Sequence, residues 1–162
     1  MKIRGKVVRF GDNVNTGTII PVKYLSGAAG LGDLVPHLFE ALRPGIAPRL
    51  RGSVVVGGVN FGAGSSREHA VTAIQAAGVG AVLARSFARS YFRNAINLGL
   101  PVVELDTRSF EDGHRIEADL DLGEVRNLDT EERHPIRPMP EIMRAMLREG
   151  GLIPYFKKHG NL

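Results

Sequence analysis

The spacing of apolar and polar residues predicts strands alternating with helices over the first part of the chain. Residues 2–9 (KIRGKVVR) alternate weakly, as in a half-buried strand, and later short apolar runs are typical of fully buried strands. Helices are expected where apolar residues recur at helical spacing and a glycine ends the run. The predicted elements are a strand at 53–56, a helix at 65–77, a strand at 81–84, a helix at 87–98 and a strand at 101–104. This order indicates a largely parallel sheet covered by helices.

The region between the first two strands is less regular. Residues 26–32 (SGAAGLG) hold three glycines and two alanines, which predict a mobile loop. Asp33 is expected to cap a helix that continues through Leu42 and ends at 43–45 (RPG). The apolar face of this helix would carry Leu34, Leu38, Phe39 and Leu42.

The last part of the chain has a different pattern. Residues 109–127 predict two short strands joined by a turn at 121–123 (DLG). A helix is expected at 141–148, followed by one or two helical turns at 152–159. The predicted fold class is α/β, with residues 1–162 forming one domain that has a β-rich periphery.

Composition narrows the possible chemistry. The 162 residues are 43% hydrophobic, which suffices for a core, yet no stretch approaches the ~20 apolar residues of a membrane span. Residues 1–13 lack the apolar core of a signal peptide, so a cytoplasmic protein without membrane contact is expected. The chain has no cysteine. By itself it therefore cannot use a thiol in catalysis or hold an iron–sulfur cluster or zinc ion through cysteine.

The charge balance points to an anionic partner. There are 21 Lys and Arg residues against 17 Asp and Glu, for a net charge of +4. The basic residues are scattered and only 6% of residues are aromatic, a combination that disfavours nucleic acid as the partner. A small anionic molecule or an acidic protein fits better.

One short stretch, residues 61–70 (FGAGSSREHA), concentrates chemical groups directly after an apolar run. It matches a helix-capping box, in which Ser65 accepts a hydrogen bond from the backbone of Glu68 and the Glu68 side chain returns one. It also fits an anion pocket, because a helix start attracts negative charge and Arg67 in the first turn is unfavourable unless an anion accompanies it. Its place after a strand of an α/β sheet is where ligands usually bind.

Several segments together resemble one known family. The stretch 61–70 is similar to a motif of the small subunit of 3-isopropylmalate dehydratase, the swivelling domain of the aconitase superfamily. The other matching segments, in the same order along the chain, are FGDNVNT at 10–16, IIP at 19–21, YL at 24–25, SFAR at 86–89, FRNAIN at 92–97, GLP at 99–101 and GGL at 150–152. The resemblance covers nearly the whole chain and implies the swivelling-domain (β/β/α) fold.

The resemblance implies a reaction and roles for the motif. Enzymes of this family move a hydroxyl between adjacent carbons of a malate-type acid by dehydration and rehydration. Ser65 corresponds to the base that takes the proton from carbon, and Arg67 to the group that binds a substrate carboxylate. Ser66 and Gly64 are expected to contact the substrate beside them.

The resemblance also implies a partner. The [4Fe–4S] cluster that acts on the departing hydroxyl lies on a large subunit in this family. This chain has no cysteine and is expected to bind no cofactor or metal itself, so it would act only in a heterodimer or heterotetramer with that subunit.

The segment Tyr24, Leu25 and Ser26 lies where the family reads the variable side chain of its substrate. The glycine-rich loop that follows contains no cation, which favours an alkyl-substituted malate such as isopropylmalate over a tricarboxylate. The alternatives are the small subunit of homoaconitase or of another alkylmalate dehydratase. The loop could also be only a flexible linker.

One departure from the family pattern bears on activity. The family usually has Asp-Thr-Asp where this chain has Asn15-Thr16-Gly17, so Gly17 replaces an active-site aspartate. The change is consistent with altered substrate choice, with substitution by a neighbour such as Asp12, or with weak activity. It also keeps open a different class of function, a non-catalytic ligand- or nucleic-acid-binding domain on the same fold.

Three arginines recur every four residues near the second helix, at Arg85, Arg89 and Arg93. They fit either a basic stripe that meets the large subunit or the substrate, or an ordinary solvated helix face.

Overall fold

The strands form one seven-stranded sheet with the order β4-β3-β2-β1-β5-β6-β7 in the computed structural model, which describes residues 1–161. The strands are β1 Lys2–Arg9, β2 Ser53–Val56, β3 Ala81–Ala84, β4 Val102–Glu104, β5 Arg115–Asp119, β6 Glu124–Asn127 and β7 Arg133–Pro135. Strands β1 to β4 are parallel. Strand β5 pairs antiparallel with β1, and β6 and β7 extend the sheet from it, each antiparallel to the strand before. The predicted α/β class with a parallel half and a β-rich periphery is confirmed.

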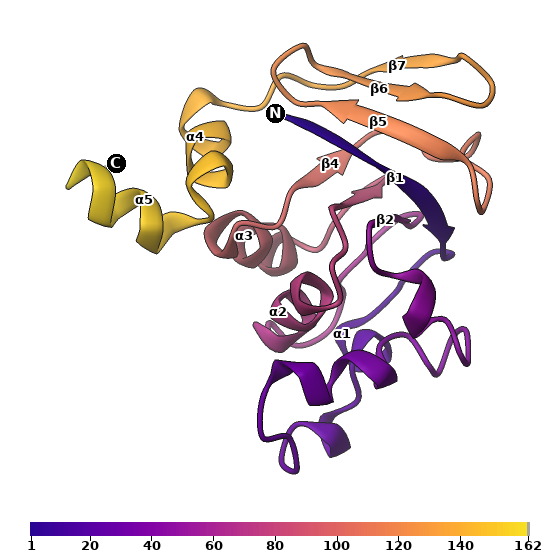
Figure 1. Cartoon of the computed structure of the whole chain (residues 1–162), viewed down its shortest axis with the longest axis vertical. Coiled ribbons are helices and arrows are strands. Elements are labelled where there is room, and N and C mark those ends of the chain that lie inside the picture. The colour runs from indigo at the N-terminus through magenta and orange to yellow at the C-terminus, as the bar shows by residue number, and fades with distance from the viewer. Residues whose placement is uncertain (162) are drawn as a thin grey trace.

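The helices gather around the parallel half of the sheet, as Figure 1 shows. Their bounds are α1 Thr16–Ile19, α2 His69–Ala76, α3 Arg89–Leu98, α4 Glu141–Glu149 and α5 Leu152–His159. Helix α3 contacts α2 on one side and α4 and α5 on the other, and α1 contacts α2. Four single 3-10 turns add to these helices, at Val22–Tyr24, Leu31–Asp33, Val35–His37 and Ala47–Arg49. None of the helices within residues 1–161 is long and apolar enough to cross a membrane.

The core lies where the parallel strands meet the helices. Every residue of β2 and β3 is buried. Because successive side chains of a strand point to opposite faces, this means that both faces of the sheet are covered at these strands. A strand that is buried on both faces requires a continuous apolar run and not an alternation of apolar and polar residues. Both strands have such a run, so both were predicted correctly from the sequence.

The helix expected at 33–42 is wrong. The structure has short 3-10 turns there, at Leu31–Asp33 and Val35–His37, and then Phe39 at a φ of 57°. Pro36 removes a backbone donor and disfavours the helical conformation of the residue before it. The side chain of Asp33 accepts a hydrogen bond from the Ala29 backbone (2.9 Å) and so ties down the preceding loop.

The burial of this segment differs from a helical face. Leu34, Leu38 and Phe39 are buried as expected, and Phe39 stacks on Phe10 with the ring centroids 4.2 Å apart. Leu42 is 44% exposed, because the chain has turned away from the core by that point.

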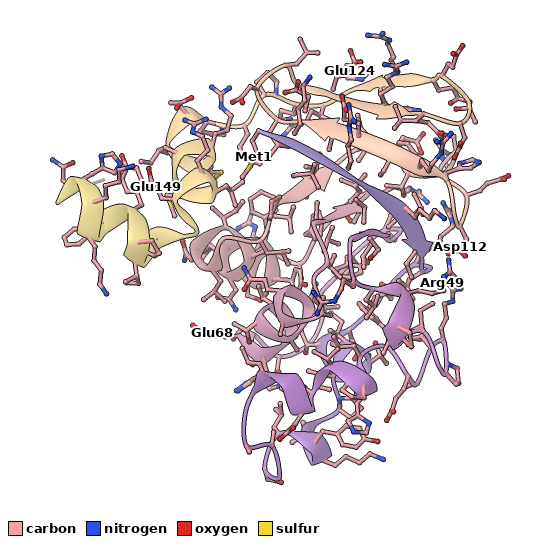
Figure 2. All side chains as sticks on the ribbon, in the orientation of Figure 1. Met1, Arg49, Glu68, Asp112, Glu124 and Glu149 are labelled. Carbon is pink, nitrogen blue, oxygen red and sulfur yellow. The ribbon has the colours of Figure 1, made fainter. Side chains whose placement is uncertain are left out.

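A network of arginines around Asp112 joins the loops at one end of the sheet. Arg43 and Arg49 each donate to the Asp112 carboxylate (2.8 Å), and so does the Arg9 backbone (2.8 Å). Figure 2 shows Arg49 and Asp112 next to each other at this edge. Partial burial by itself would raise the pKa of the Asp112 carboxyl, but the hydrogen bonds from Arg43, from the Arg9 backbone and from Arg49 hold that pKa well below its usual range.

The hairpin predicted within 109–127 is confirmed as β5 and β6, and a third strand, β7, extends it without having been predicted. The helices expected at 141–148 and 152–159 correspond to α4 and α5. The helix expected at 87–98 starts two residues later than predicted, at Arg89.

Candidate active site

Three segments that are distant in sequence converge at the carboxyl ends of the parallel strands. The loop after β2 passes beside the loop after β1: the Gly62 backbone donates to Val14 (2.7 Å) and the Thr16 backbone to Ala63 (2.8 Å). A bridge between Phe61 and Phe87 joins the same loop to the segment before α3. This edge of a parallel sheet is the usual position of a ligand site in α/β proteins.

The path of the loop is set by a cluster of aromatic rings under it. Phe61 is fully buried and packs edge-on against Tyr91, with ring centroids 5.4 Å apart. Gly62 then turns at a φ of +84°, and a Cβ atom at this position would overlap the Tyr91 ring. Only glycine satisfies both the positive φ and the close approach. The aromatic cluster therefore supports the loop that carries Ser65 and Arg67.

The capping box predicted for Ser65 and Glu68 is wrong. Helix α2 begins at His69, four residues later than expected, and its N-cap residue Glu68 makes no side-chain capping hydrogen bond. Ser65 Oγ pairs with the Arg67 side chain, and the Ser66 carbonyl pairs with Asn94 of α3, so these two residues lie outside the helix. Glu68 lies at the outer surface beside α2 (Figure 2) and is exposed.

Ser65 is instead paired with Arg67. Its Oγ atom accepts a hydrogen bond from Arg67 Nε over 2.7 Å. The Ser65 side chain is exposed, so it is accessible to a ligand, while the next residue is tethered to α3 because Asn94 Nδ2 donates to the Ser66 carbonyl (2.9 Å). The hydroxyl and the guanidinium therefore act as one unit held by the loop.

The Arg67 guanidinium keeps hydrogen-bond donors that its pairing with Ser65 does not use. Its Nη1 atom is buried and has no hydrogen-bond partner, and no carboxylate within residues 1–161 forms an ion pair with it. A buried guanidinium donor without a partner is costly, about 1–3 kcal/mol, unless a ligand completes it. The arrangement is suited to a carboxylate, which can accept two parallel hydrogen bonds from one guanidinium.

The residue that departs from the family pattern lies directly against this guanidinium. A Cβ atom built on Gly17 would be 3.8 Å from Arg67 Nη2. Asp12 forms no ion pair with Arg67 within the described residues, and its Oδ1 atom accepts a hydrogen bond from the Val59 backbone instead (2.8 Å). Asn15 caps α1 through Thr18 N (2.8 Å) and is likewise engaged. Gly17 thus leaves Arg67 without a carboxylate partner among residues 1–161.

Thr16 is a site residue that sequence reasoning missed. It is only 2% exposed, and its Oγ1 atom has no hydrogen-bond partner in the part of the chain that the structure describes. A Cβ atom on Gly64, which has a φ of +98°, would be 3.3 Å from this oxygen. Thr16 and Gly17 therefore face the Gly64–Arg67 segment. The resemblance of residues 10–16 to the family's first loop was the available signal, but only the fold shows which side chain points at the motif.

The segment expected to read the substrate's side chain has its own internal contacts. The Tyr24 hydroxyl donates to Glu40, and the Tyr24 ring stacks on His37 with centroids 3.7 Å apart. The hydrogen bond to Glu40 raises the pKa of Tyr24, and the same bond, followed by the one from His37, lowers the pKa of Glu40.

The other two residues of that segment are placed differently. Leu25 packs partly against the core, and Ser26 is exposed. None of the hydrogen bonds found within residues 1–161 joins residues 24–26 to Ser65 or Arg67, so their role toward a substrate stays a prediction.

A [4Fe–4S] cluster does not fit this chain. It has no cysteine, and residues 1–161 contain no group of three His, Asp or Glu side chains placed to hold a metal ion. What the site offers is an exposed hydroxyl, a guanidinium with free donors and a buried threonine hydroxyl.

Comparisons with known proteins point to one group of relatives. The family described as "Aconitase C-terminal domain" matches residues 49–108, which include the Ser65–Arg67 loop. The chain is 44% identical to "3-isopropylmalate dehydratase small subunit 2" of Archaeoglobus fulgidus over 100% of this chain and 99% of the relative. It is 45% identical to "Methanogen homoaconitase small subunit" of Methanothermobacter thermautotrophicus over 96% of this chain and 91% of the relative. A solved structure of 3-isopropylmalate dehydratase from Methanocaldococcus jannaschii superposes with a TM-score of 0.93 at 38% identity, covering 99% of this chain and 96% of that one.

Proposed function

The chain belongs to the family of 3-isopropylmalate dehydratase small subunits, and we propose that it supplies a serine base and a carboxylate-binding arginine to a two-subunit hydro-lyase that interconverts 2- and 3-isopropylmalate. The observation that carries this assignment is the pairing of Ser65 with an arginine that keeps a buried, unpartnered donor.

Arg67 would position the substrate. With Nε engaged by Ser65, its Nη1 and Nη2 atoms remain for a substrate carboxylate. Binding the carboxylate at this point brings the adjacent carbon to the Ser65 hydroxyl, which is exposed and can approach it.

Ser65 would move the proton. A serine hydroxyl is a weak base unless its alkoxide is stabilised, and a guanidinium 2.7 Å away supplies that stabilisation. In the dehydration, the alkoxide takes a proton from carbon, the hydroxyl on the neighbouring carbon takes a proton from solvent and leaves as water, and an alkene acid forms. In the rehydration, the hydroxide of a water molecule adds to the carbon that lost the proton and the second proton of that water returns to solvent. Ser65 gives its proton to the other carbon, which yields the isomer and regenerates the alkoxide.

The partner of this reaction is a large subunit. The relatives are named as small subunits, and the lack of cysteine here is consistent with an iron–sulfur cluster that resides on the other chain. The cluster would act as a Lewis acid toward the departing hydroxyl. Alone, this chain is expected to be inactive.

The substrate we assign is an alkyl-substituted malate. The loop at residues 26–32 offers small and apolar residues, including the exposed Leu31, and no cation that would bind a third carboxylate. The homoaconitase small subunit among the relatives is the specific observation that favours a second candidate, a homoaconitase-type tricarboxylate.

The test is reconstitution with the large subunit from the same genome. The complex should dehydrate 2- and 3-isopropylmalate, followed by the ultraviolet absorbance of the alkene acid, and the small chain alone should be inactive. Turnover of homoaconitate but not isopropylmalate would select the second candidate. Failure of the two chains to copurify would contradict the proposal and favour a non-catalytic binding domain.

A further inference from the structure

A groove of about 440 Å³ lies at the open edge of the sheet, outside the loop that carries Ser65. Strand β4 is the last strand of the sheet on this side. The groove lies between β4, the first turns of α3 and the segment that leads into α4. Its apolar floor is formed by Phe87, Phe92, Val103, Ile136, Met139 and Met143.

The rim of the groove is strongly basic. Arg89 and Arg93 line it from α3, and Arg137 lines it from a segment much later in the chain. All three side chains are exposed, and none forms an ion pair within the described part of the chain. The single acidic residue of the lining, Glu104, accepts a hydrogen bond from the Phe87 backbone (3.3 Å). We call the groove formed by this rim and the apolar floor the arginine groove.

The position of Arg89 indicates that an anion belongs there. It is the first residue of α3, whose N-cap residue, Ala88, provides no capping side chain and whose first turn holds no acidic residue. A cation at a helix start is unfavourable by a few tenths of a kcal/mol unless negative charge is nearby. The lining has three arginines and one carboxylate, so the groove keeps a net positive charge that an acidic partner would balance.

The start of α3 and the residues before it, which form one side of the groove, also hold the active-site loop in place through hydrogen bonds. The Ala88 backbone donates to the Phe61 carbonyl (2.9 Å), and the Asn60 backbone donates to Ser86 Oγ (2.8 Å). Asn94 of α3 holds the Ser66 carbonyl. A protein that covers the active site and extends past α3 would reach the groove.

We propose that the arginine groove receives a segment of the large subunit that carries an apolar side chain flanked by carboxylates. This inference rests on the proposed function. An apolar centre with exposed arginines around it has the composition of a protein–protein contact. A free small anion fits less well, because no buried polar side chain lines the groove to hold it.

The test compares two double charge reversals in the reconstituted complex. Arg89→Glu with Arg137→Glu changes the groove. Lys2→Glu with Arg51→Glu makes the same change in charge on exposed residues that have no ion pair within residues 1–161 and lie outside the groove lining. We expect the groove variant to bind the large subunit at least tenfold more weakly in biolayer interferometry, and the control variant to stay within twofold of wild type. Raising the salt concentration should weaken wild-type binding more steeply than that of the groove variant.

The outcomes separate this inference from the proposed function. If the wild-type complex is active and the groove variant binds as tightly as the control, the groove inference is overturned and the proposed function stands. If the wild-type chain does not bind the large subunit at all, both fall. Met139→Asp, which alters the floor and leaves the arginines in place, should also weaken binding at least tenfold, and wild-type affinity in this variant would count against the groove.

Other occupants give distinct results. Sedimentation of the small chain alone would reveal a dimer lost in the groove variant if a second copy fills the groove. Binding of a dicarboxylate to the isolated chain, lost in the groove variant while its affinity for the large subunit is unchanged, would assign the groove to a small anion. Either result would overturn the proposal.

Discussion

Replacing Ser65 by alanine separates the proposed catalytic role from a structural one, because the two roles predict effects of very different magnitude. The side chain is exposed and makes one hydrogen bond, to Arg67 Nε. Losing one exposed hydrogen bond costs about 0.5 kcal/mol of folding free energy, which in a domain of this size lowers Tm by about 1–2 °C. Removing a base should instead lower kcat about a thousandfold, or ~4 kcal/mol of transition-state stabilisation.

The assay follows alkene formation from isopropylmalate by the reconstituted complex, with thermal unfolding of the small chain in parallel. Ser109→Ala is a matched control, because Ser109 is an exposed serine remote in sequence from the loop. Retention of kcat within tenfold of wild type would refute the catalytic role of Ser65. A loss of about 1 kcal/mol of stability would instead point to a helix cap that the structure does not contain.

Three further substitutions test the site and the fold. Gly17→Asp should give the introduced carboxyl a pKa about one unit below that of a free aspartate, because Arg67 Nη2 lies 3.8 Å from the position of its Cβ atom. A pKa near 3.9 for this carboxyl, measured by NMR titration, would contradict this placement of Arg67. Gly62→Ala should lower the free energy of unfolding by about 2–4 kcal/mol in urea, since it adds overlap with the buried tyrosine ring to a positive φ, whereas Gly45→Ala, with positive φ and open space, should cost about 1 kcal/mol. Asp112→Asn should lower Tm most above about pH 5, and the difference from wild type should shrink as the pH falls below ~4, because a carboxyl with a depressed pKa stabilises the fold only while it is ionised; a pH-independent difference would refute the role of its charge.

The parallel strands could be predicted because their cause is local. Residues 53–56 and 81–84 are short apolar runs between turn residues, and burial on both faces requires that pattern. The helix expected at 33–42 failed because its apolar spacing arose from a segment that buries side chains through successive turns. Pro36 within it disfavours a continuous helix at this position.

The candidate site was predictable in its members but not in its geometry. The motif around Ser65 and Arg67 was recognised from the sequence, and so was the departure at Gly17. The capping box was not correct, because Ser65 Oγ pairs with the Arg67 side chain and the Ser66 carbonyl with Asn94 of α3. A four-residue capping pattern does not include a contact with a segment 28 residues away.

The sequence by itself determined the strands of the buried sheet, the family and the residues of the motif, since each depends on spacing within a short window or on several matching segments. Only the tertiary structure decided that Thr16 and Gly17 face the motif, that Arg67 keeps an unpartnered donor, and that Arg137 joins Arg89 at one groove. The physical reason is that these relations are set by how strands and helices pack, which brings together side chains that no local pattern connects.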